Sequence, residues 1–214
     1  MPKARKKIKL TWAELKIQRN ALGRFQLYLP TLQLKQQQLQ MTIGQVRKDY
    51  ERTLADLRSV KAKIAAYEPI FRDRGGINLI EMSEPEEIRT SIKNMAGVRV
   101  PLLESVSFTE AVYSLFGTPP WVDRALVDLR EKRGLESRLE VLQEQMALLQ
   151  AELKKVLQRV NLFEKIIIPE TKENIRRIRI ALGDAMTAAV ARAKIAKAKL
   201  EEREQTGRLE ARIP

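Results

Sequence analysis

The chain has 214 residues, of which 31% are charged and only 5% are aromatic, and its formal net charge is +13. The scarcity of aromatic side chains argues against a thick globular core, whereas the apolar share of 44% is too high for a disordered chain. Because the sequence contains neither cysteine nor histidine, it excludes disulfides, most transition-metal sites and nucleophiles activated by a cysteine–histidine pair.

The first predicted element is one long helix over about residues 8–68. Apolar residues recur at every seventh position from Ile8 to Ile64, except at Gln36, which is the repeat of a coiled-coil seam. Pro30 removes a backbone donor and is expected to kink this helix, because the seam keeps its phase across the proline. The predicted seam residues are Leu15, Leu22, Ile43, Tyr50, Leu57 and Ile64. A weaker companion series consists of Phe25, Leu32, Leu39, Val46, Thr53 and Val60.

Residues 69–120 are predicted to form a small lobe inserted between two helices. This segment holds five of the nine prolines and four of the nine glycines, and the helical phasing is lost within it. Apolar residues alternate with polar ones on both sides of a turn at 94–97, which predicts a β-hairpin over about residues 86–103. Capping-box patterns at Ser83–Glu87 and Ser107–Glu110 leave short helical turns as an alternative.

A second long helix is predicted over residues 121–214, with a frayed tail from about residue 205. Thr118 can cap this helix, and the two prolines that follow suit its first turn. Its apolar residues recur in steps of three and four up to Ile167 and resume one residue out of phase after Pro169, so the helix must adjust locally there. The predicted seam residues are Leu139, Leu142, Met146, Leu149, Leu153, Val156, Val160, Phe163 and Ile167.

These elements together predict a mainly α fold. We expect a long antiparallel two-helix left-handed coiled coil, formed by the N- and C-terminal helices, with the hairpin-containing lobe inserted between them. No uncharged apolar run approaches the roughly 20 residues that span a bilayer, so we expect no direct membrane span.

The sequence lacks the motifs that usually carry catalysis. No phosphate-binding loop, dinucleotide-binding turn, zinc-protease helix or nucleophile elbow is present. We interpret Gly75 and Gly76 as a turn, and Glu84, Glu86 and Glu87 as solvated surface. A two-helix rod also offers few clefts, so we predict no catalytic residue, no metal and no cofactor.

Three segments carry a more specific signal. The first runs from Arg159 to Leu182, the second is N-M-A-G-V-R-V-P at 94–101, and the third leads from Tyr113 to Asp123. In order, spacing and chain length they resemble the D subunit of V-type and archaeal-type ATPases, over about residues 86–200. The positions that carry the motif are Asn94, Gly97, Val98, Pro101, Arg159, Asn161, Glu164 and Pro169.

The resemblance implies a non-catalytic central shaft of a rotary ATPase or ATP synthase. Such a shaft transmits torque between the catalytic ring and the membrane rotor that translocates protons or sodium ions. The implied partners are the nucleotide-binding A and B subunits around the helices, the F subunit at the lobe and lower shaft, and an adaptor of the C/d type at the foot. The chain would then lie on the cytoplasmic side of the membrane, as a peripheral part of the complex, and ATP chemistry would belong to other subunits.

Two other classes of protein compete with this interpretation. The net charge would suit a coiled coil that binds nucleic acid, but the cations alternate with acids and the few aromatic residues form no stacking platform, so we expect no nucleic-acid partner. A free-standing coiled-coil adaptor or chaperone would explain the helices but not the three motif segments.

Overall fold

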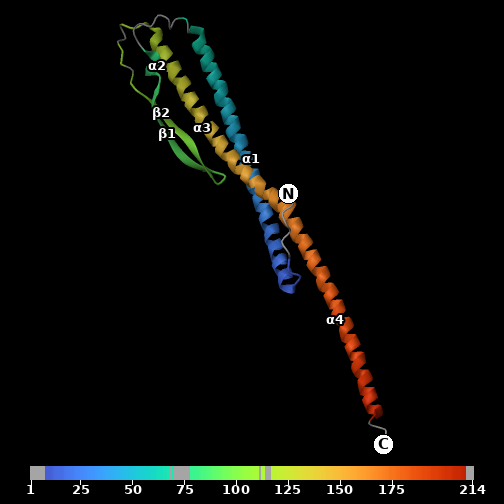
Figure 1. Cartoon of the computed structure of the whole chain (residues 1–214). Coiled ribbons are helices and arrows are strands. Elements are labelled where there is room, and N and C mark those ends of the chain that lie inside the picture. Colours follow the sequence, from blue (N-terminus) through green and yellow to red (C-terminus); the bar gives the residue numbers. More distant parts are fainter. Residues whose placement is uncertain (1–7, 68, 70–77, 111, 114–116, 211–214) are drawn as a thin grey trace. The chain divides into compact units, whose positions relative to one another are not determined.

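The computed structural model describes residues 8–67, 69, 78–110, 112–113 and 117–210, with side chains described for all of these except 67 and 204–210 (Figure 1). It confirms the predicted mainly α fold with a two-stranded antiparallel hairpin between long helices. In chain order the elements are α1 (Trp12–Tyr67), α2 (Leu79–Met82), β1 (Pro85–Met95), β2 (Val98–Phe108), α3 (Trp121–Leu162), the π-helical turn η2 (Phe163–Ile167) and α4 (Ile168–Glu210).

Helix α1 begins four residues later than the sequence pattern predicted, because Thr11 caps it. The Thr11 side-chain oxygen accepts a hydrogen bond from the backbone N–H of Glu14 at 3.3 Å, and the Thr11 carbonyl accepts the first helical bond from Leu15. The sequence Thr-x-x-Glu at 11–14 matches the capping-box pattern that marks a helix start. The helix continues through Pro30 without a break, so the proline does not split it, and the kink stays a prediction.

The chain divides into two compact units, residues 1–31 with 159–214, and residues 32–158. In the second unit, α1 and α3 are antiparallel. Lys35, Tyr50 and Lys61 along α1 contact residues that come progressively earlier in α3, namely Glu152, Gln143 and Glu136.

The seam of the second unit is buried unevenly along α1. The companion series is the deeper one, since Leu39 is 0% exposed and Val46, Thr53 and Val60 are each 3% exposed. Leu57 of the stronger sequence series is also buried, whereas Ile43, Tyr50 and Ile64 are only partly covered. Two helices enclose a narrow strip, so one of two adjacent apolar rows faces the partner helix and the other flanks it.

The α3 side of this seam follows the predicted steps of three and four. Leu139, Leu142, Leu149 and Val156 are buried, and Met146 and Leu153 are partly covered. Fully burying a Leu or Val side chain contributes about 1.5–3 kcal/mol. Most of the cohesion between the two helices therefore comes from this row.

In the first unit, the start of α1 packs against η2 and α4. Leu15, Ile175 and Ile178 form a small buried cluster, against which Ile8, Leu22 and Leu182 pack. The rings of Phe25 and Phe163 meet with centroids 5.4 Å apart and planes tilted by 57°. The contacts of Leu15 with 175–178 and of Phe25 with 163 again make the two helical stretches antiparallel.

The predicted adjustment near Pro169 takes the form of the π-helical turn η2. The backbone N–H of Ile168 bonds to the carbonyl of Phe163, five residues earlier, so one extra residue is accommodated in the turn. Buried positions then continue as Ile168, Thr171, Ile175 and Ile178. The one-residue offset in the sequence pattern reflects this turn.

The hairpin is longer than predicted. Its strands pair from Met95 opposite Val98 out to Pro85 opposite Phe108, with irregularities in register near both Pro85 and Arg89. The connecting residues Ala96 and Gly97 have φ of 51° and 80°, as a two-residue type I′ turn requires.

The two helical alternatives beside the hairpin are wrong. Ser83 ends the short helix α2 instead of starting a new one, and its hydroxyl donates to the carbonyl of Ile80. Ser107 lies in β2, where it pairs with Glu87. In both places the pairing of the strands outweighs the local capping preference.

Candidate partner-binding surfaces

Among the described residues, no group of three or more His, Cys, Asp or Glu side chains could hold a metal ion. Glu84, Glu86 and Glu87 are exposed, while Gly75 and Gly76 lie outside the part of the chain that the structure describes. Within the same described part, none of the helices combines the length and the apolar character that crossing a membrane requires.

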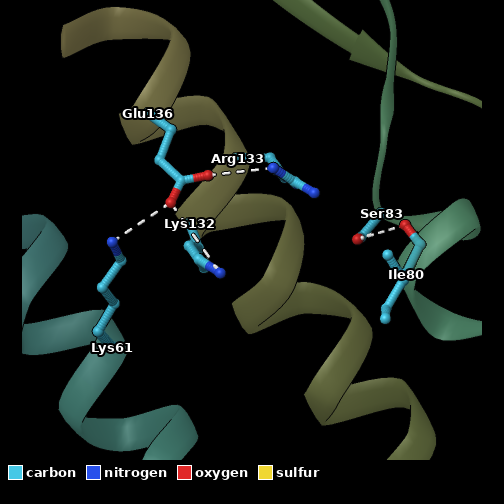
Figure 2. A network of polar contacts seen from close by, with 6 residues as sticks. All are labelled: Lys61, Ile80, Ser83, Lys132, Arg133 and Glu136. Carbon is cyan, nitrogen blue, oxygen red and sulfur yellow. Dashed lines mark hydrogen bonds and ion pairs between the residues drawn. The ribbon is translucent and has the colours of Figure 1, made fainter.

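Cross-helix polar contacts fix the register of α1 against α3. In Figure 2, the carboxylate of Glu136 forms an ion pair with Lys61 of α1, with an N–O distance of 3.4 Å. It also forms ion pairs with Lys132 and Arg133 of its own helix, at 4.0 and 3.3 Å. Farther along, Lys35 pairs with Glu152 at 3.1 Å. Pairs this exposed contribute about 0–1 kcal/mol each, so they align the helices more than they stabilise them.

The hairpin is anchored on α3 by its second strand, and β1–β2 lies alongside that helix in Figure 1. Gln145, which is 3% exposed, donates its side-chain N–H to the carbonyl of Pro101. Beside this bond, Val100 is 1% exposed. The edge of β2 therefore faces α3 and is held by a buried hydrogen bond.

Arg130 of α3 contacts the end of the hairpin that lies opposite its turn. Its guanidinium donates to the carbonyls of Met82 and Thr109 and lies 5.5 Å from the centre of the Phe108 ring. One side chain thereby joins α2, the end of β2 and α3. The base of the lobe is thus held to the helix independently of Gln145.

Four of the motif positions lie at or near the tip of the hairpin. Asn94 ends the polar run of β1 and is exposed, Val98 begins β2 and is partly covered, and Pro101 supplies the carbonyl that Gln145 binds. Gly97 has φ of +80°, a conformation that other residues adopt only with strain, and Lys35 Nζ lies 3.8 Å from where its Cβ would be. These residues therefore define the turn and its attachment.

The other four motif positions surround η2. Arg159, Asn161 and Glu164 are exposed, and within the described residues neither Arg159 nor Glu164 forms an ion pair. Pro169 is also exposed and is the second residue after the π-helical turn. The buried neighbours in this stretch are Val160, Ile168 and, in part, Phe163 and Ile167. The polar motif residues thus form a solvent-facing surface beside the seam.

A groove runs between α1 and α4 in the first unit, with a volume of about 620 Å³. The sequence reasoning, which expected few clefts, missed it. The residues that line it are Arg19, Leu22, Gly23, Gln26, Lys172, Ile175, Arg176, Arg179 and Ile180, called here the cationic groove. The spacing of the four that belong to α1 places them on one helix face. That spacing was readable in the sequence, but the facing stretch of α4 was not.

Three titrating groups have pKa values that are shifted by their neighbours. Hydrogen bonds from Arg176 and then Arg177 lower the pKa of Glu173, and the bond to Glu173 raises the pKa of Arg176. The hydroxyl of Tyr113 donates to Asp123, and this bond, with some burial and the carboxylate charge, raises the pKa of the phenol. Because its pKa is lowered, Glu173 is ionised at neutral pH and forms an ion pair with Arg176, one of the cations that line the groove.

Comparison with known proteins identifies the chain. The sequence profile of the ATP synthase D subunit matches residues 14–198. The chain belongs to the ATP synthase D-subunit family. The D subunit of the V-type ATP synthase of Borreliella burgdorferi is 39% identical over 197 residues, which cover 91% of this chain and 95% of the relative. The corresponding protein of Chlamydia pneumoniae is 36% identical over 201 residues, covering 94% and 96%. The resemblance inferred from the motif segments is thereby confirmed.

As a member of the D-subunit family, the chain is one component of a multi-subunit complex. Three surfaces are candidates for contacts with other subunits: the hairpin tip, the polar residues around η2, and the cationic groove. Sequence motifs pointed to the first two. The third depends on two distant stretches of chain lying side by side, a relation that no local pattern in this D-subunit sequence carries.

Proposed function

We propose that this chain is the central shaft of a V-type rotary ATPase or ATP synthase, and that it transmits torque between the nucleotide-binding ring and the ion-translocating membrane rotor. The observation that supports this most directly is the antiparallel pairing of α1 with the C-terminal helical run in both compact units. Two helices joined by a row of buried apolar side chains resist twisting better than either helix alone. A shaft must have this property.

In the proposed shaft, the apolar seam and the polar contacts between the helices have different roles. Buried apolar residues such as Leu39, Leu149 and Ile178, all 0% exposed, hold the helices together. The pairs Lys35–Glu152 and Lys61–Glu136 join α1 to α3 at two separate points and so favour one register of the two helices. We assign torque transmission to the predicted seam positions on this basis.

The partners follow from the proposed role. The A and B subunits would surround the shaft helices, the F subunit would contact the lobe and lower shaft, and an adaptor would join the foot to the membrane rotor. In this scheme residues 1–68 and 121–214 form the shaft and residues 69–120 the lobe. The exposed motif residues Arg159, Asn161 and Glu164 would contact these neighbours. The chain would be non-catalytic and peripheral on the cytoplasmic side, because ATP is bound by other subunits.

A rotation assay tests the proposal. The chain has no cysteine, so a single substitution, Glu104→Cys at an exposed hairpin position, gives one attachment site for a bead. In a complex immobilised through its catalytic ring, the bead should rotate in one direction when ATP is added. A bead that stays fixed while the same complex hydrolyses ATP would contradict the proposed function, and the cysteine-free chain controls for non-specific attachment.

A further inference from the structure

We propose that the cationic groove of the first unit binds an acidic amphipathic helix supplied by another subunit of the complex. The inference deepens the proposed function, on which it rests, by assigning a partner chemistry to one surface of the chain. It depends on the shape, the charge and the apolar content of the groove.

The shape of the groove suits a helix. Arg19, Leu22, Gly23 and Gln26 recur along one face of α1, and Lys172, Arg176, Arg179 and Ile180 do the same on α4. A groove between two paired helices is the place where a third helix packs, with its apolar residues at similar spacing. Gly23 contributes no side chain, which leaves room for a close approach.

The charge of the groove is unbalanced. Its described lining includes four cationic side chains and no acidic one. Arg176 is bound by Glu173 at 2.9 and 3.1 Å, but within the described residues Arg19, Lys172 and Arg179 take part in no ion pair. Three cations are therefore available to carboxylates from outside, and electrostatic complementarity selects an acidic partner.

The apolar residues of the groove distinguish a protein helix from a free polyanion. Leu22 is partly covered, Ile175 is buried, and Ile180 is 52% exposed at the rim. A nucleic acid or a phosphate would satisfy the cations but leave Ile180 in contact with water. A helix with apolar anchors between Asp and Glu residues covers both kinds of surface.

The occupant must come from a different chain type. A second copy of this chain carries the same net charge of +13, and the amino-terminal cluster of Lys3, Arg5, Lys6, Lys7 and Lys9 is basic as well. Either of these would meet the groove with charge of the same sign. An acidic stretch of another subunit is the complementary candidate.

Charge reversal tests the electrostatic part. The double variant Lys172→Glu/Arg179→Glu is compared with Arg24→Glu/Arg192→Glu, which makes the same charge change at exposed positions of the same unit outside the groove. Binding to the purified complex lacking this chain is measured at low and high salt. The groove variant should lose about tenfold or more in affinity and much of its salt dependence, and the control less than about threefold. Equal losses would overturn the proposal. The proposal would also be overturned if the groove variant bound the complex normally and lost only its affinity for duplex DNA.

Filling the groove tests its shape. No heavy atom lies within 4 Å of a Cβ built at Gly23, and the same holds at Gly44 of α1 in the other unit. Gly23→Leu should therefore leave helicity and thermal unfolding intact, yet weaken binding to the same complex by about tenfold through steric exclusion. Gly44→Leu serves as the matched control. Normal binding by Gly23→Leu would show that nothing occupies the groove.

Cross-linking identifies the occupant. A photoreactive phenylalanine analogue is placed at Gln26 in the assembled complex, and the cross-linked peptide is sequenced by mass spectrometry. The expected product is a helix-forming segment of another subunit with Asp or Glu beside apolar residues. A basic or neutral segment, or no cross-link, would overturn the inference. If groove variants assemble and rotate normally, the inference about the groove fails and the proposed shaft function stands. If the bead stays fixed in a complex whose groove is occupied, the shaft function is refuted and the inference about the groove stands.

Discussion

Replacing Ile178 with Ala should destabilise the first unit strongly. Ile178 is 0% exposed, and the other buried members of its cluster, among the described residues, are Leu15 and Ile175. Removing a buried Ile side chain to Cβ costs about 2–5 kcal/mol through lost burial and the cavity left behind. Because a two-helix core lies close to solvent and can relax, we expect a loss near the lower end, about 2–3 kcal/mol.

The matched control is Ile195→Ala, at a position of the same helix that is 58% exposed. This change should alter stability by less than about 0.5 kcal/mol, because surface substitutions away from packed features are usually nearly neutral. Urea unfolding followed by circular dichroism gives the overall free energy of unfolding, and hydrogen exchange at 12–25 and 170–182 gives the local one. If both variants unfold at the same urea concentration and exchange alike, the cluster does not hold the helices together.

Three further changes probe local features. In the folded chain the pKa of Glu173 lies below its usual value of 4.5, so its pairing with the arginines should stabilise the helix above about pH 4.5. This stabilisation should be lost as the pH falls through the lowered pKa. Carboxyl NMR measures the titration, and Glu173→Gln should remove the pH dependence. Gly97→Ala, at φ of +80°, should destabilise the hairpin by about 1–2 kcal/mol, seen as faster amide exchange in β1 and β2 but not in α4. Arg130→Ala leaves the carbonyls of Met82 and Thr109 without its donors and should cost about 1–3 kcal/mol, with faster exchange at 80–83 and 107–110. Unchanged exchange there would show that the lobe is held elsewhere.

Much of the architecture could be predicted from periodicity. The steps of three and four in 139–167 correspond to an unbroken row of buried or partly covered residues, and the turn chemistry at 94–97 predicted the hairpin. The offset after Ile167 was visible as a change of phase, and it corresponds to the π-helical turn. These features are local, so the chain order carries them directly.

Other features depend on tertiary neighbours. The strands extend to Pro85 and Phe108 because the two strands pair across a register irregularity that breaks the alternation of apolar residues. Ser83 had the appearance of a cap but ends α2, since the next residues pair with β2. Which of the two apolar rows of α1 is deeper depends on the rotation of the helix toward α3. None of these is set by the local sequence.

The π-helical turn has a consequence for length along the C-terminal helix. The hydrogen bond from Ile168 to Phe163 spans five residues, whereas a bond in a regular α-helix spans four. The stretch from Phe163 to Ile168 therefore contains one residue more than a regular α-helix needs to carry the same apolar row. Gain or loss of one residue elsewhere in the packed stretch before Ile175 would turn every following side chain by about 100° and expose Ile175 and Ile178. Within the described part of α3, η2 and α4, this turn is where an extra residue is already accommodated while the apolar row continues.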